Sequence, residues 1–204
     1  MPGVASTESP WQRALGEEFT QLHPRLLSYF SAIPPGRVGR GTGTFDRLGT
    51  PRRWLWPALR VLERRSVLFP VWEQNVPFAI ENWPDGGALR AARSFHLPGG
   101  DRVMVDSVSI EGGRLVDRLG DGGAGGRGSL RTGLRASVLD GALLLVSTEA
   151  RWGRVRIPFA PRLRLIERFD DDAGRQHVSL TLHSPLLGRV YEYSGHFDYR
   201  IESP

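Results

Sequence analysis

The sequence contains no cysteine and no lysine among its 204 residues. Without cysteine, disulfide bonds and thiolate metal sites are excluded, and a cytoplasmic location is the default expectation. No apolar run approaches the roughly 18 residues of a membrane-spanning helix; the longest, 142–146, is the length of a strand. The N-terminus lacks a basic start followed by an apolar block, so we expect neither a secretory signal nor a transmembrane segment.

All 27 basic residues are arginines, and the formal net charge is +5. A basic balance of this kind raises the question of nucleic-acid binding. The arginines are scattered, however, and their densest cluster comprises Arg52, Arg53, Arg60, Arg64 and Arg65. No zinc-knuckle spacing or aromatic RNA-binding signature accompanies them. With glycine, alanine and proline also enriched, the arginine bias indicates GC-rich codon usage, and nucleic acid is not an expected partner.

The N-terminal part of the chain has helical signals. Residues 1–8 are expected to be a disordered lead-in, and 9–204 to form a single domain. Ser9 before a proline is a helix start, and apolar residues at helical spacing predict helix near 10–31. A second apolar stripe predicts a helix near 51–65, with a kink or a late start at its internal proline.

The rest of the chain alternates with period two and is punctuated by glycine-rich turns, the pattern of antiparallel strands. Between these runs lies no helical stretch that would allow a parallel sheet. We therefore predict a mainly β (α+β) fold, a curved antiparallel sheet or β-barrel of about nine to ten strands with one or two N-terminal helices packed on or into it. The glycine-rich segment 36–48 is expected to be a short strand or loop. The nine predicted strands are 76–83, 89–97, 101–110, 114–120, 130–139, 142–151, 162–169, 175–184 and 189–200.

The last predicted strand carries an aromatic row. Tyr191, Tyr193, Phe197 and Tyr199 occupy alternate positions and share one side of the strand. Gly195 interrupts the row and leaves room for a bend or a crossing neighbour. We interpret the row as an inner wall of the barrel.

Four charged residues lie on the otherwise apolar faces of their predicted strands: Arg93, Asp106, Asp117 and Glu167. A lone buried charge costs several kcal/mol, so these groups should pair, change protonation or line a wet cavity. Arg93 is their one cation, and Glu167 is its expected partner. Such a pair is either an internal salt bridge that fixes strand register or a polar anchor for a ligand.

Signals for cofactors and metals are missing. No two histidines have the spacing of a helical metal-ligand pair, and no serine lies in a nucleophile elbow. The glycine-rich segments 39–44 and 120–128 lack the lysine and the strand–turn–helix context of a phosphate-binding loop. The second is expected to be a connection between strands. We expect no metal and no cofactor.

Several motifs resemble a bacterial family, the domain-of-unknown-function family numbered four-one-six-six. Its most specific positions are Pro158, Pro161, Glu167, Pro185, Leu186, Gly188, Tyr193 and Gly195. That domain occurs alone or behind an NAD(P)-binding domain of saccharopine-dehydrogenase type. This sequence has no dinucleotide-binding fingerprint, so an NAD(P)-dependent oxidoreductase could act here only as a separate partner. Arg93 also falls on a family motif position, although Ala92 stands where the family usually has tryptophan.

Three functional hypotheses follow. The leading one is a binding module whose apolar barrel holds a hydrophobic or amphipathic metabolite in a cavity of at least about 300 Å³. The second is a cyclase or isomerase in which Glu167, Asp106 or Asp117 is the general acid or base. The third is a non-catalytic partner of an oxidoreductase that docks through Trp54 and Trp56. The expected ligand-binding residues are Arg93, Glu167, Phe95, Phe78, Leu165, Tyr191, Tyr193, Phe197 and Tyr199.

Overall fold

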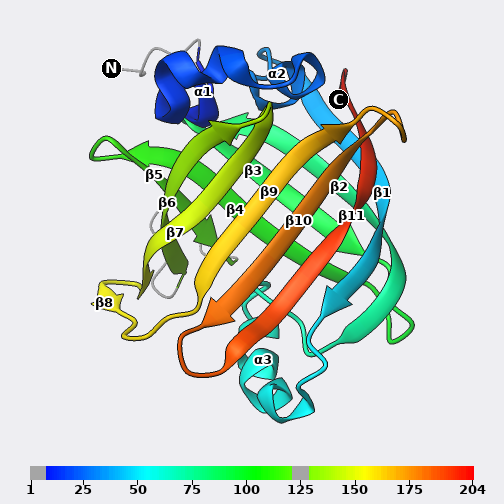
Figure 1. Cartoon of the computed structure of the whole chain (residues 1–204), viewed down its shortest axis with the longest axis vertical. Coiled ribbons are helices and arrows are strands. Elements are labelled where there is room, and N and C mark those ends of the chain that lie inside the picture. Colours follow the sequence, from blue (N-terminus) through cyan, green and yellow to red (C-terminus); the bar gives the residue numbers. More distant parts are fainter. Residues whose placement is uncertain (1–7, 121–128) are drawn as a thin grey trace.

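The structure, a computed structural model, describes residues 8–120 and 129–204 (Figure 1). The predicted lead-in, apart from Glu8, and the predicted connection at 121–128 lie outside the described residues. Within the described part, no helix is long and apolar enough to cross a membrane.

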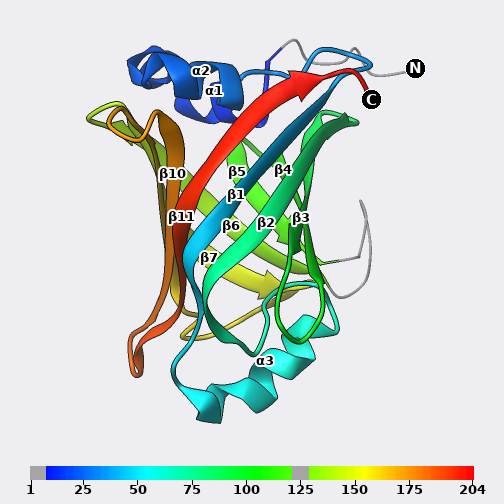
Figure 2. The same cartoon turned by 90° about the vertical axis from the view of Figure 1, so that its right-hand side faces the viewer.

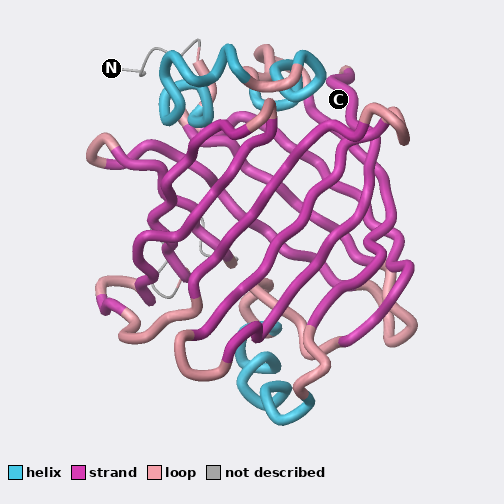
Figure 3. Tube along the Cα trace, viewed as in Figure 1, coloured by secondary structure: helices cyan, strands magenta, loops and turns pink. Residues whose placement is uncertain are grey.

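Ten antiparallel strands form a closed barrel. They run around the ring in the order β1–β2–β3–β4–β5–β6–β7–β9–β10–β11, and pairing of β11 with β1 closes it, while β8 extends β7 outside the ring. Figure 3 shows the two walls of strands crossing each other. The strands are β1 (Val38–Gly49), β2 (Trp72–Asp85), β3 (Ala88–Phe95), β4 (Arg102–Glu111), β5 (Arg114–Leu119), β6 (Leu130–Leu139), β7 (Ala142–Trp152), β8 (Val155–Arg156), β9 (Arg162–Asp170), β10 (Arg175–Ser184) and β11 (Gly188–Glu202).

All nine predicted strands are present, and the predicted barrel class is confirmed. The segment predicted as a short strand or loop is instead the 12-residue strand β1. Its glycines hide the period-two alternation because they have no side chains. Neighbouring aromatic residues occupy the space that those side chains would fill. A Cβ on Gly43 would lie 2.5 Å from the Cβ of Phe197, and one on Gly195 would lie 2.6 Å from the Cα of Phe45. The close approach of β1 to β11 therefore requires glycine on both strands.

Short helices stand at the two ends of the barrel (Figure 2). At one end the predicted helical region is divided into three pieces, and at the other the predicted helix begins late, after a 3-10 turn, with Pro57 in its first turn. The first end has α1 (Pro10–Leu15), the 3-10 helix η1 (Gly16–Gln21) and α2 (Pro24–Phe30); the second has the 3-10 helix η2 (Arg53–Leu55) and α3 (Trp56–Glu63).

The helices α1 and α2 close their end of the barrel with apolar side chains. Ser9 caps α1 in a capping box with Gln12, which satisfies backbone donors at the helix start. Trp11 and Phe30 are buried and meet edge to face, with ring centroids 5.5 Å apart. Leu143 and other interior aliphatic side chains pack beneath them, so this end is plugged.

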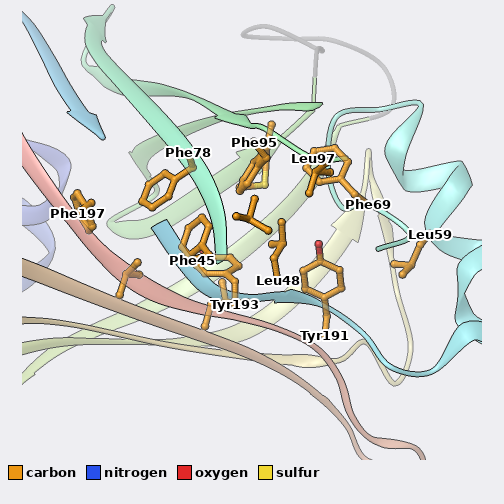
Figure 4. Close-up of a cluster of buried hydrophobic side chains, with 14 residues drawn as sticks. Phe45, Leu48, Leu59, Phe69, Phe78, Phe95, Leu97, Tyr191, Tyr193 and Phe197 are labelled. Atoms are coloured by element: carbon orange, nitrogen blue, oxygen red, sulfur yellow. The ribbon is translucent and has the colours of Figure 1, made fainter. Parts of the chain in front are cut away.

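A cluster of aromatic side chains fills the interior beside β1, β2, β3 and β11 (Figure 4). Phe45 stacks on Phe78 with centroids 4.0 Å apart, and it also contacts Phe95 and Tyr193. We call this the aromatic cluster; it comprises Phe45, Phe69, Phe78, Phe95, Tyr191, Tyr193 and Phe197.

Candidate functional site

A line of polar side chains crosses the barrel interior from β3 to β6. We call it the polar seam; it consists of Arg93, Asp106, Asp117 and Thr132. Strand register sets it, because Ala91 pairs with Asp106, Val108 pairs with Asp117, and Asp117 pairs with Thr132. Consecutive members of the seam are therefore diagonal or direct cross-strand neighbours, close enough to interact.

Arg93 forms an ion pair with Asp106. The expected pairing with Glu167 is wrong, because Asp106 lies on the strand next to Arg93 whereas Glu167 lies on β9, several strands away around the ring. Burial alone would lower the pKa of Arg93, but the Asp106 carboxylate opposes this and the net shift is upward. For Asp106, burial raises the pKa and Arg93 counteracts it. The pair keeps Arg93 charged inside the barrel.

Asp117 is the seam residue with an unsatisfied atom. Its Oδ1 is buried and has no hydrogen-bond partner among the described residues. Burial, followed by the neighbouring charge of Asp106, raises its pKa well above the ordinary value. This shift favours the protonated carboxyl group, which can donate one hydrogen bond as well as accept others.

Glu167 approaches the interior from β9 and is 5% exposed. Its Oε1 accepts a hydrogen bond of 3.4 Å from Nε2 of Gln176. Burial raises the pKa of Glu167 to about 8, against a smaller lowering by Arg93. Glu167 is therefore a second interior acid that holds its proton at neutral pH.

The polar seam forms one wall of an interior cavity of about 260 Å³. Arg93, Asp106, Asp117 and Thr132 all line it, and the remaining wall is predominantly aliphatic. Among the aliphatic lining residues are Leu134, Leu145, Leu163, Leu165, Leu180 and Leu182. The volume is just below the about 300 Å³ at which pockets for drug-sized molecules begin, so it suits a smaller molecule than the sequence suggested.

A smaller chamber of about 60 Å³ lies nearer the helical plug. Glu167, Tyr29 and Asn82 line it, and Arg93 and Asp106 line both this chamber and the larger cavity. Burial raises the pKa of Tyr29 well above its usual value. The Arg93–Asp106 pair thus stands between two spaces of different polarity.

The predicted ligand wall is only partly assembled around the larger cavity. Tyr193 and Leu165 line it together with Arg93, whereas Glu167 lines only the smaller chamber. The other predicted wall residues, Phe78, Phe95, Tyr191, Phe197 and Tyr199, line neither space, and all but Tyr199 belong to the aromatic cluster.

Some lining residues were not expected from the sequence. Thr132 lies on the apolar side of its strand, and this break in the period-two pattern was a usable signal. Tyr29 reaches the smaller chamber from α2, and no pattern within its own helix shows which end of a barrel that helix covers.

On the outside of the barrel, side chains from three strands form a group suited to a metal ion. Asp46, His177 and His196 each offer one donor atom, and these atoms lie within 4.8 Å of one another. Spacing along the chain does not reveal this group, since strand pairing brings its members together.

No curated protein matches the sequence. Residues 22–197 match the family described as domain of unknown function DUF4166. That span runs from the helical plug to the aromatic row of β11 and includes every residue of the polar seam, and the chain therefore belongs to this family.

Proposed function

We propose that the protein binds a small, largely apolar molecule that carries one hydrogen-bonding group. The observation that supports this most directly is the unpartnered Oδ1 of Asp117 on the wall of an otherwise aliphatic cavity. Buried polar groups in folded proteins almost always have partners, so an unsatisfied one needs an explanation. A ligand hydroxyl or carbonyl group would supply the missing partner.

The polar seam suits recognition of a neutral group better than a charged one. Asp106 already neutralises Arg93, and burial favours the protonated form of Asp117. A ligand carboxylate would have to compete with Asp106 for Arg93 and would lie near a second acid. A hydroxyl or carbonyl group needs no such exchange, because the protonated Asp117 can donate to it.

The size of the cavity restricts the ligand further. An apolar protein cavity of about 150 Å³ holds benzene, and the cavity here is about 260 Å³. A ligand with one or two fused rings, or a short branched chain, matches this volume. Burial of its apolar surface contributes roughly 25 cal/mol per Å², which makes the aliphatic wall the main source of affinity.

The probe for this proposal is 1-naphthol, which joins a two-ring apolar body to one hydroxyl group and is fluorescent. We expect saturable binding to the wild type. Leu182→Trp should lower the affinity at least about tenfold, because the new ring fills the cavity, and Asp117→Leu should lower it less. The matched control is His183→Trp, which places the same ring on the outside of β10. Native mass spectrometry of the purified chain would reveal any carried ligand.

Two results would contradict the binding proposal. One is the absence of saturable 1-naphthol binding together with no carried small molecule in the native spectrum. The other is equal weakening by Leu182→Trp and His183→Trp, which would place the probe outside the cavity.

A second candidate function is proton transfer by Glu167. The structure favours it in one respect, because Arg93 pairs with Asp106 and Glu167 keeps a pKa of about 8. A general acid works best when its pKa lies near the working pH. If bound ligand extracted after incubation in D₂O carries deuterium, and Glu167→Gln abolishes that incorporation, Glu167 moves the proton; incorporation that survives the substitution excludes it.

A further inference from the structure

The group formed by Asp46, His177 and His196 is positioned by the backbone. His177 and His196 are directly opposite each other on β10 and β11, with ring centroids 4.7 Å apart. Asp46 is the extra residue of a bulge in β1, since Phe45 pairs with Gly195 and Arg47 already pairs with Ser194. Bulges redirect side chains, and this one brings a carboxylate to a cross-strand histidine pair.

The surroundings of the group fit a metal ion. Nε2 of His196 lies 3.3 Å from Oδ2 of Asp170, and a carboxylate on one ring nitrogen orients a histidine that ligates through the other. Arg168 is opposite His177, but Asp170 also pairs with Arg168 at 3.1 Å and offsets its charge.

We propose that Asp46, His177 and His196 bind a first-row transition metal ion such as Zn²⁺ on the outer surface of the barrel. Two imidazoles and one carboxylate suit zinc, copper, nickel or iron better than magnesium or calcium. Zinc bonds of about 2.0–2.2 Å place tetrahedral ligand atoms about 3.3 Å apart. The three donor atoms lie within 4.8 Å of one another, so small side-chain movements towards the ion would complete the site. The fourth position would be left to water.

Calorimetric titration of Zn²⁺ alone into the full, tag-free chain tests the site. We expect one ion per chain, with affinity reduced at least about tenfold in His177→Ala and in His196→Ala, and also reduced in Asp46→Asn. Asp170→Asn should weaken binding about tenfold through the orientation of His196. The control is His183→Ala, which removes an exposed histidine from the same strand and should change nothing.

Absence of saturable Zn²⁺ binding would overturn the site, as would wild-type affinity in both histidine variants. Equal weakening by His183→Ala would show scattered binding to surface histidines and would overturn it as well. Thermal unfolding of each metal-free variant confirms that a loss of binding is not a loss of fold.

A different observation concerns the end of the barrel that carries α3. Most of the strongly exposed large hydrophobic side chains lie in the segments at that end, namely η2 and α3, β8 with its following loop, and the turn between β10 and β11 (Figures 1 and 2). They are Trp54, Val61, Val155, Phe159, Leu186 and Leu187, with exposures from 40% to 79%.

The same segments are strongly basic. Exposed arginines in them are Arg53, Arg60, Arg64, Arg65, Arg154, Arg156, Arg162 and Arg189. Segments 50–67, 153–162 and 185–190 contain one acidic residue, Glu63, and it is bonded to Arg102. This combination of exposed apolar and basic side chains is that of a protein surface that lies in the interface of an anionic membrane.

The interior cavity reaches towards this end. Leu62 and Val67, from α3 and the segment after it, line the cavity, and so do Ile157 and Pro161 from the loop after β8. The opposite end is plugged by Trp11 and Phe30. An apolar ligand that enters from the α3 end would pass between the exposed apolar side chains.

We infer that the α3 end docks on an anionic lipid surface, where the protein exchanges its apolar ligand; the exchange, though not the docking, rests on the proposed function. Arginines would bind lipid phosphates, and the ring of Trp54 and the side chains of Leu186 and Leu187 would enter the headgroup region. Each arginine near such a surface adds to the attraction, which falls with salt.

Co-sedimentation with phosphatidylcholine vesicles containing 25% phosphatidylglycerol tests the docking. We expect binding that raised salt weakens, and a loss of at least about fivefold in Trp54→Ser/Leu186→Ser and in Arg60→Glu/Arg64→Glu. Matched controls at the plugged end are Leu139→Ser, equally exposed to Trp54 at 59%, and Arg13→Glu/Arg25→Glu. Both controls should bind as wild type.

No vesicle binding, or equal losses in the two sets of variants, would overturn the docking. Binding to an RNA or protein with no affinity for vesicles would overturn it in favour of that partner. Titration with 1-naphthol in the absence of vesicles separates the two proposals. The protein can dock on vesicles even if the cavity binds no ligand, and the cavity can bind a ligand even if the protein does not dock.

Discussion

The two sides of the barrel interior differ sharply. Beside β1, β2, β3 and β11, aromatic rings pack against one another. Beside β4, β5, β6, β7, β9 and β10, aliphatic side chains and the polar seam surround a cavity. An eight-stranded barrel is just narrow enough for side chains to fill, and ten strands enclose more space. The aromatic rings on one side are large enough to fill their half of the barrel interior, whereas the leucine side chains on the other side are too short to fill theirs.

The two sides of the same sheet therefore differ in how their interior side chains are packed. The aromatic cluster holds the barrel closed at the contact of β11 with β1, where glycines allow the two strands to approach closely. The hollow side tolerates buried acids because the cavity and the polar seam accommodate them. We therefore expect substitutions on the two sides of the interior to behave differently.

The largest expected effect comes from Glu167→Gln on the hollow side. A carboxyl whose pKa rises on folding from 4.5 to about 8 supports the fold fully below pH 4.5 and loses that contribution as the pH rises to 8. The variant lacks this loss. Its advantage over wild type should therefore grow from near zero at pH 4.5 to as much as about 5 kcal/mol above pH 8.

Denaturant unfolding of both proteins at a series of pH values measures this advantage. The control is Glu17→Gln, which makes the same substitution at an exposed position of η1. If the difference in unfolding free energy between Glu167→Gln and wild type did not change with pH, Glu167 would be ionised inside the barrel at neutral pH, contrary to its burial.

A second prediction compares truncations on the two sides. Phe45→Ala removes a ring that is 1% exposed and contacts three other rings of the aromatic cluster, and it should cost about 4 kcal/mol. Leu134→Ala acts on the wall of the existing cavity, where fewer contacts are lost, and should cost about 2 kcal/mol. Equal costs in urea unfolding would show that the cavity wall is packed as tightly as the aromatic cluster.

Much of the fold follows from local pattern. The nine alternating runs with glycine-rich turns predict antiparallel strands, and their number requires closure of the sheet. β1 escapes prediction as a full strand because Gly39, Gly41 and Gly43 have no side chains to alternate. Their role appears only when Phe197 and Tyr199 of the neighbouring strand are seen to occupy the vacant space.

The charged residues of the candidate site were predictable from the sequence, but their pairings were not. The period-two pattern placed Arg93, Asp106, Asp117 and Glu167 inside, where the structure has them. It could not choose among the acids for Arg93, because that choice depends on strand order and register. Most residues of the predicted aromatic wall pack in the aromatic cluster and do not line the cavity. The sequence could not show this, since alternation indicates which residues face inward and not which of them meet another ring.

A third prediction tests the polar seam itself. Arg93→Met leaves Asp106 without its partner, and loss of one member of a buried pair costs about 3–5 kcal/mol. We expect the lower end, about 3 kcal/mol, because burial already raises the pKa of Asp106 and a proton can replace the lost charge. Arg93→Met/Asp106→Leu removes both charges and should recover most of the loss, as replacement of buried ion pairs by apolar residues often does. Urea unfolding of the single and double variants measures the coupling. A double variant no more stable than Arg93→Met would mean that Arg93 is held by the wider seam, including Asp117, and not chiefly by Asp106.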